Sequence, residues 1–206
     1  PPRGGPTDLS ALLGDLTGRP RLQRPLSQLR QLELDNGVIA FRQNGGPVSW
    51  RGQVGSARLE KTSGRLSGSL ALSIGSARLS VRADGAVGLE HAAVQARLSD
   101  MDPARIFPAV GPTRALAALD APVDADGAMS WAADRGVEAG DVRLSAGPGE
   151  LRLPAGRQSF AGGELRAVYE PAGRRVRLQA ARLRTASADL DLSGEFWIEP
   201  ASRTSP

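Results

Sequence analysis

Only one residue in this chain could act as an acid–base group near neutral pH, and no partner residues accompany it. His91 is the sole histidine among 206 residues, and the chain contains no cysteine. A serine or cysteine hydrolase needs a nucleophile held against such a base, yet no G-x-S-x-G nucleophile motif occurs in the sequence. We therefore interpret His91 as a solvated strand or turn residue and predict no enzymatic activity, no metal site and no cofactor.

The acidic residues form two candidate sites, and neither fits the chemistry it would have to perform. Asp124-Ala125-Asp126-Gly127 resembles the middle of a calcium-binding loop, but Pro122 and Ala133 then occupy the first and last ligand positions. Those positions require oxygen-bearing side chains. Asp189 and Asp191 alternate with leucines, so we expect both carboxylates to face water. An acid–base pair of carboxylates would need one of them buried.

Glycines and arginines could recognise phosphate, but their surroundings argue against it. Gly147-Pro148-Gly149 lacks the spacing of a phosphate-binding G-x-G-x-x-G loop, and we interpret it as a turn between strands. The net charge is only +4, and Lys61 is the only lysine. A sheet that binds nucleic acid interleaves aromatic residues with its basic ones. No aromatic residue alternates with the strand arginines, so we predict no nucleic-acid partner; these arginines are Arg58, Arg78, Arg82, Arg97, Arg166 and Arg177.

The elements that would position these residues change type along the chain. Leucines at helical spacing predict an amphipathic helix over residues 7–17, and prolines predict a linker up to residue 26. From residue 27 to 199, apolar and polar residues alternate with a period of two, as in antiparallel strands wetted on one face. Residues 200–206 form a predicted tail.

Local signals divide the strand region. Asn36-Gly37 predicts a tight hairpin turn, and the glycines and proline of residues 44–47 predict another. Asp102-Pro103 is a favourable helix start, so residues 102–119 are predicted to be a helical insertion with sheet on both sides.

The composition is compatible with two arrangements of the apolar face of the sheet. About a dozen strands rarely remain a flat sheet, and the predicted helices are too short to cover them. One solution is a closed β-sandwich that serves as a structural or partner-binding module. Sandwich cores usually rely on large aromatic residues, whereas this chain is 4% aromatic. The other solution is a sheet that curls around an open apolar groove.

Four stretches of the chain carry a family resemblance. They are the leucine-rich start followed by LSQLRQLELDNGVIAF, the strand ARLEKTSGRLSGSLAL, the centre MDPARIFPAV…ALAALDAPVDADGAMSW, and the run from VRLSAGPGELRLP to TASADLDLSGEF. Together they resemble the AsmA-like superfamily of bacterial envelope proteins, and within it the YhdP type. The sequence departs from the family at Arg42, where an aspartate is expected, and it lacks the N-terminal transmembrane anchor.

The resemblance implies a mainly β fold, in which a curled antiparallel sheet forms an open, apolar-lined groove. It also implies the periplasmic portion of an inner-membrane-anchored protein that conducts phospholipid toward the outer membrane, in outer-membrane biogenesis. The implied partners are phospholipid acyl chains, the membrane through the missing anchor, and other envelope proteins.

Strand parity predicts which residues share a face, and the resemblance makes that face the lining of the groove. An aspartate at Leu72 or Leu178 is expected to remain hydrated in such a groove and to leave the sheet folded. The predicted groove residues are Leu70, Leu72, Ile74, Leu79, Val81, Val94, Leu98, Leu144, Leu165, Val176, Leu178, Leu190, Leu192 and Phe196.

Overall fold

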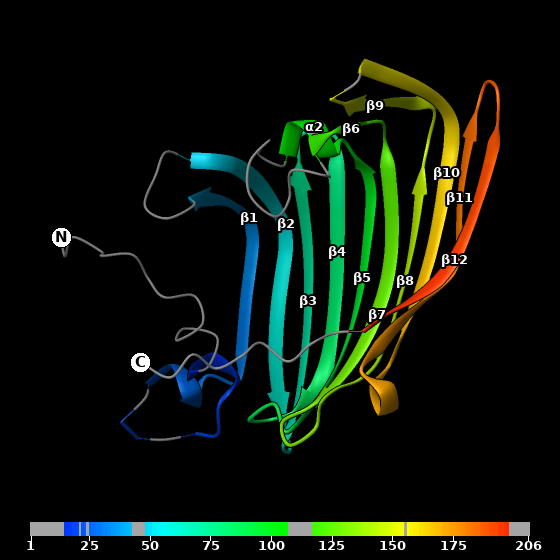
Figure 1. Ribbon diagram of the computed structural model, residues 1–206. Coiled ribbons are helices and arrows are strands. Elements are labelled where there is room, and N and C mark those ends of the chain that lie inside the picture. Colours follow the sequence, from blue (N-terminus) through cyan, green and yellow to red (C-terminus); the bar gives the residue numbers. More distant parts are fainter. Residues whose placement is uncertain are drawn as a thin grey trace, which may run out of the picture.

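A single antiparallel sheet of 12 strands makes up most of the protein (Figure 1). The computed structural model describes residues 15–42 except 21 and 24, 48–106, 117–154 and 156–197. The strands are β1 (Gln31–Arg42), β2 (Val48–Thr62), β3 (Arg65–Ile74), β4 (Ala77–Ala86), β5 (His91–Met101), β6 (Leu119–Asp120), β7 (Val123–Ala132), β8 (Gly136–Ala146), β9 (Gly149–Leu153), β10 (Gly156–Glu170), β11 (Arg175–Thr185) and β12 (Asp189–Trp197). The helical elements are one-turn segments: η1 (Pro25–Gln28), α2 (Pro103–Ile106) and η2 (Pro171–Gly173).

The sheet is open, with β1 at one edge and β12 at the other. Its main order is β1-β2-β3-β4-β5-β7-β8-β10-β11-β12, while the short strands β6 and β9 pair with each other beside β10. Figure 1 shows the strands as a curved wall, with α2, β6 and β9 at its upper end and the η1 segment at its lower end. The predicted mainly β fold with an open, curled antiparallel sheet is confirmed. In the described part of the chain, no second sheet closes it into a sandwich.

Tight turns explain why consecutive strands pair with their neighbours. Ser63 and Gly64 connect β2 to β3 in two residues, and both have a left-handed backbone, with φ of 48° and 83°. Such a pair matches the twist of a two-residue hairpin. Gly75, with φ of 61°, begins the equally short turn from β3 to β4. Strands joined in this way form a meander with a fixed register.

The predicted hairpin turn at Asn36-Gly37 is wrong. Asn36 does adopt a left-handed backbone with φ of 56°, but β1 continues through it. Asp35 pairs with Ser56 and Gly37 pairs with Val54 on β2. Because the 15 residues of β2 offer a partner along all of β1, the ladder on both sides of Asn36 outweighs its local turn preference.

The leading segment and the tail lie partly outside the described residues. Of the helix predicted over residues 7–17, residues 15–17 are helical, and the earlier ones are not described. The last residues of the predicted linker belong to the helix η1. The predicted turn at 44–47 and the tail at 200–206 are not described either.

The predicted helical insertion begins as expected and ends differently. Pro103–Ile106 forms the helical turn α2, and residues 107–116 lie outside the described residues. The prediction of helix through Leu119 is wrong at its end, because Leu119 pairs with Leu151 of β9. The Arg152 amide also donates to the Ala118 carbonyl at 2.8 Å, so β9 supplies the backbone partners there.

Candidate functional site

Cross-strand pairing collects the apolar residues of the sheet on one face. Residues directly opposite each other in an antiparallel pair share a face, and successive residues alternate. One continuous row consists of Leu72, Leu79, Leu98, Ala125, Leu144, Leu165, Ala181 and Leu192. The next row consists of Leu70, Val81, Ala96, Gly127, Val142, Ala167, Leu178 and Gly194. A third consists of Gly68, Ala83, Val94, Met129, Gly140, Tyr169, Val176 and Phe196.

We call the face that carries these rows the inner face. All fourteen residues predicted to line the groove lie on it: twelve are members of the three rows. Ile74 shares the parity of Leu72 on β3, and Leu190 that of Leu192 on β12. From Ala77 to Asp84 on β4 and from His91 to Leu98 on β5 the inner residues are less exposed than their outer neighbours, although no second sheet in the described part covers them. This sheltering is expected on the hollow side of a curved sheet.

The inner face is almost free of charge. No aspartate, glutamate or arginine occurs in the three rows described above. Lys61, which lies opposite the inner residue Leu66 beyond the end of the third row, is a charged side chain on this face. Tyr169 is the one polar side chain within the rows. Such a surface offers dispersion contact and hydrophobic burial but few groups that could fix a polar ligand.

The solvent exposure of side chains on this face varies across the sheet. Leu72 is 6% exposed and lies beside Val54, which is fully buried. An added Cβ on Gly52 would lie 2.6 Å from the Leu72 Cδ1 atom, so Leu72 packs directly over β2. The expectation that Leu72 lies in a wetted groove is therefore wrong. Near the other edge, Leu192 and Phe196 are 64% and 60% exposed.

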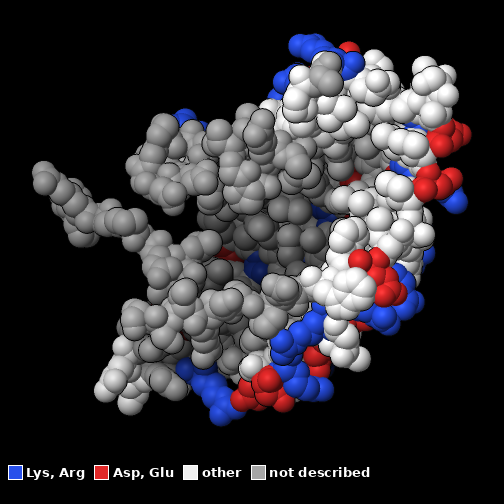
Figure 2. All heavy atoms as spheres, in the orientation of Figure 1, with Lys and Arg blue, Asp and Glu red and all other residues white. Residues whose placement is uncertain are grey.

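The opposite face, which we call the outer face, carries the charges. The six strand arginines singled out in the sequence all take outer positions by register. Several are paired: Arg97 Nε lies 2.8 Å from Asp126 Oδ1, and Arg58 bonds the Glu33 carboxylate. That hydrogen bond and its charge raise the pKa of Arg58. Figure 2 shows the charged side chains gathered along the outer right-hand side of the described part.

The residues that sequence analysis set aside as chemical candidates are dispersed in the structure. His91 is an exposed residue that begins β5 and pairs with Ala132. Asp126 pairs with Arg97, and Asp124 accepts a hydrogen bond from the Asp100 amide at 2.9 Å. Among the described residues, no three acidic or histidine side chains form a group that could hold a metal ion.

Several exposed members of the inner face were missed in the sequence, among them Met129 and Val142. Met129 and Val142 are 43% and 36% exposed on β7 and β8. Both lie on the apolar parity of their strands, opposite Gly140 and Gly127 respectively. β7 was overlooked because its other inner positions include Ala125 and Gly127. The alternation of small residues with aspartates was nevertheless a detectable signal.

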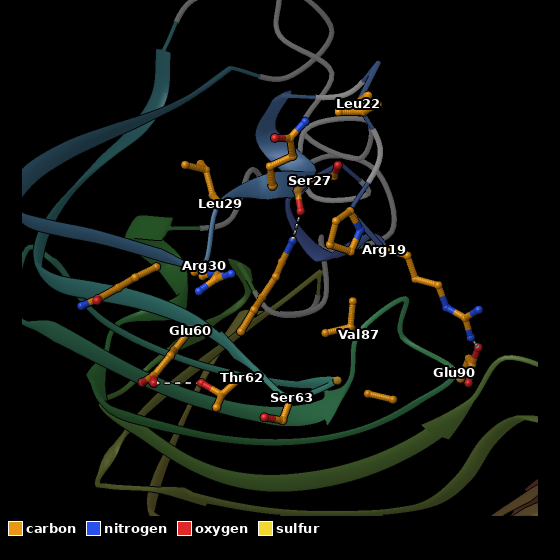
Figure 3. Close-up of a pocket in the computed structure, with 16 residues that line it drawn as sticks. Arg19, Leu22, Ser27, Leu29, Arg30, Glu60, Thr62, Ser63, Val87 and Glu90 are labelled. Atoms are coloured by element: carbon orange, nitrogen blue, oxygen red, sulfur yellow. Dashed lines mark hydrogen bonds and ion pairs between the residues drawn. The ribbon is translucent and has the colours of Figure 1, made fainter.

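A pocket lies at the lower end of the inner face. Its volume is about 1100 Å³, and it lies between the leading segment, with Leu22, Ser27 and Leu29, and the strand-end turns, with Ser63 and Val87 (Figure 3). The leading segment is fixed there by a hydrogen bond from the Gly88 amide to the Thr17 carbonyl at 2.8 Å. The Arg19 guanidinium also bonds the Glu90 carboxylate.

Lys61 is the basic side chain that reaches this pocket from the inner face. Its Nζ donates to the Ser27 carbonyl at 3.0 Å and to the Gly18 carbonyl at 3.3 Å. Partial burial lowers the pKa of Lys61, because the ammonium loses hydration. Lys61 was missed as a site residue, although its alternation with Leu59 already indicated the apolar parity.

Comparison with known proteins adds no relative. No family model, curated protein or solved structure matches this chain. None of the helices in the described ranges combines the length and apolar character needed to cross a membrane.

Proposed function

We propose that this chain is a segment of a lipid-conducting protein of the bacterial envelope, and that its inner face binds phospholipid acyl chains. The proposal takes the chain to be the periplasmic part of an inner-membrane-anchored protein of AsmA-like type, which moves phospholipid between the inner and outer membranes. No catalytic step belongs to this function.

One observation carries the proposal: in the described part of the chain, a wide, continuous apolar face has no second sheet over it. A single exposed leucine is ordinary on a protein surface, whereas a contiguous apolar patch marks an interaction site. Met129, Val142, Leu192 and Phe196 are each at least one-third exposed on the same face. Strands of 10 or 11 residues make this face about 35 Å long in the strand direction.

The chemistry of the inner face suits acyl chains that move. Each CH₂ group removed from water contributes about 0.8 kcal/mol, which favours covering the face with hydrocarbon. A lipid tail that leaves a bilayer for this face exchanges one apolar surface for another, so the net free-energy change is small. The rows consist mainly of Leu, Val, Ala and Gly, and Tyr169 carries their one polar side-chain group. Few polar contacts within the rows can therefore create a deep local minimum that would hold one chain in place.

Lipid carried through purification tests the proposal. The chain is expressed in a bacterial periplasm, purified in mild detergent and extracted, and bound phospholipid is quantified by mass spectrometry. The matched variants are Val142→Asp on the inner face and Val38→Asp on the outer face, where Val38 is 73% exposed opposite Gln53. Both place the same carboxylate on an exposed strand position.

We expect phospholipid with the wild-type chain and with Val38→Asp, and a strong loss with Val142→Asp. Equal lipid in both variants, or none in the wild-type chain, would contradict the proposal. Co-purification of a protein in place of lipid, lost with Val142→Asp, would favour the alternative function of a partner-binding module.

A further inference from the structure

Lys61 is a charged residue of the inner face, and it lies at one end of that face rather than in the middle. Lys61 is the last inner residue of β2 before the turn at Ser63, and it lies directly opposite Leu66. The apolar rows begin one step along the same strand, at Leu59 opposite Gly68. An amphiphilic ligand placed along β2 would therefore meet hydrocarbon-like surface first and a cation at its lower end.

The Lys61 ammonium retains capacity for an anionic ligand. An ammonium has three N–H donors, and two of them are directed to the carbonyls of Ser27 and Gly18. No carboxylate of the described residues lies within ion-pair distance of it. The adjacent Glu60 has outer parity, opposite Ser67, and accepts a hydrogen bond from Thr62 Oγ1 at 3.2 Å. Among the described residues, one donor and a full positive charge thus remain without an anion.

The surrounding pocket reinforces the positive charge. Arg19 is neutralised by Glu90, but Arg30 also lines the pocket and pairs with no described carboxylate. The lining holds three basic residues and two acidic ones, which leaves it positive overall. Figure 3 shows Arg30 between the leading segment, at Leu29, and the strand that carries Glu60 and Thr62. The volume of about 1100 Å³ exceeds what one phosphate group needs.

We infer that this pocket binds the phosphate of a phospholipid headgroup, with Lys61 as the principal ligand and Arg30 as the second cation. The acyl chains of the same lipid lie on the apolar rows that begin at Leu59. This inference rests on the proposed function and adds an orientation of the lipid to it. The headgroup lies at the η1 end of the groove. Lysine recognises phosphate as a compact point charge, so the site accepts different phospholipid headgroups.

Paired lipids with and without a phosphate-bearing headgroup test the inference. Phosphatidylglycerol and diacylglycerol with identical acyl chains are presented in neutral detergent micelles, and the affinity of the purified chain for each is measured. The variants are Lys61→Gln, Lys61→Arg and Arg30→Gln. Arg82→Gln, which removes an outer-face cation opposite Ser69, is the matched control. Thermal melting of each variant confirms that it is folded.

We expect the wild-type chain and Arg82→Gln to bind phosphatidylglycerol about tenfold more tightly than diacylglycerol, as one charge-assisted hydrogen bond would give. Lys61→Gln should bind both lipids alike, Arg30→Gln should lose part of the preference, and Lys61→Arg should keep it. A preference that survives Lys61→Gln, or its absence in the wild-type chain, would overturn the inference while leaving groove binding intact. Binding of inorganic phosphate but not of phosphatidylglycerol would also overturn it. Failure of both lipids to bind would instead refute the proposed function itself.

Discussion

Leu72 on β3 and Leu192 on β12 belong to the same cross-strand row of the inner face, yet they are 6% and 64% exposed. The row crosses the sheet through paired residues, so the difference comes from what lies over each end. Leu72 packs beside Val54 and over Gly52, whereas β12 is an edge strand with a single neighbour. The inner face is therefore tightly packed around Leu72 and Val54 and open toward β12.

Aspartate substitutions at these two leucines should separate core from groove. Leu72→Asp places a carboxylate among buried side chains and should lower the free energy of unfolding by about 3–5 kcal/mol. Leu192→Asp leaves the carboxylate hydrated and should change the free energy of unfolding by less than about 1 kcal/mol. Denaturant unfolding followed by circular dichroism measures both. Similar losses in the two variants would show that the β12 side is also covered.

Lys61 should make stability depend on alkaline pH. Burial lowers the pKa of Lys61 in the folded chain below its ordinary value of 10.5. Between these two pKa values the unfolded chain binds more protons, so the stability contributed by this group rises with pH and levels off above 10.5. The charged groups lining the same pocket are Arg19, Arg30, Glu60 and Glu90.

The difference in unfolding free energy between the wild-type chain and Lys61→Gln isolates this contribution, because the other titrating groups are common to both. We expect that difference to shift in favour of the wild type as pH rises toward 10.5. A difference that stays constant with pH, or moves the other way, would show that Lys61 is not desolvated.

Gly149 should tolerate alanine far less well than Gly194. A Cβ at Gly149 would overlap the Asp120 carbonyl and the Ala121 side chain, whereas a Cβ at Gly194 would meet no atom within 4 Å. Gly149→Ala should cost about 1–3 kcal/mol and loosen the pairing of β6 with β9. Gly194→Ala should be neutral or stabilise slightly. Hydrogen exchange at Arg152, whose amide donates to Ala118, reports the local effect. Unchanged exchange in Gly149→Ala would contradict the close approach.

Glu195 should hold the lower end of β12 to the sheet. Its carboxylate lies 3.1 Å from Arg175 Nη1 and 3.3 Å from Arg177 Nε, and both arginines also pair with Glu170. These side chains are about one-third to one-half exposed, so solvent screens them less than the isolated Arg182 pair.

Glu195→Gln should weaken this end by about 1 kcal/mol and speed amide exchange along β12. Asp191→Asn, which breaks the more exposed pair with Arg182, is the control and should have a smaller effect. Equal effects of the two substitutions would argue against a cooperative network at Glu195.

Period-two alternation predicts which residues of one strand share a face, except where a register shift interrupts the strand, as between Leu178 and Ala181. The parity of Leu70 and Leu72 on β3 and of Leu190 and Leu192 on β12 follows from the pleat, whatever the strands pair with. Whether the sheet closes depends on long-range curvature, which no local pattern of residues encodes. The difference in solvent exposure along a row, from Leu72 to Leu192, could not be predicted for the same reason.

The local turn preference gave a wrong prediction where a long partner strand was available. Asn36-Gly37 carries the strongest short hairpin signal, but β2 pairs with residues on both sides of it. The role of Lys61 could not be predicted either, because its carbonyl partners belong to residues 34 and 43 positions away in the sequence. Its parity was available, but its contact with the leading segment required the fold.

Adjacent residues on β8 allow the most direct measurement of the central claim. Val142 lies on the inner face opposite Ala167, and Arg143 lies on the outer face opposite Arg166. A photo-crosslinking amino acid is placed at one position or the other, the chain is irradiated in a bacterial periplasm, and adducts are identified by mass spectrometry. The account predicts phospholipid acyl-chain adducts at position 142 and none at position 143. Adducts at both positions, at 143 alone, or only to protein at 142 would contradict it.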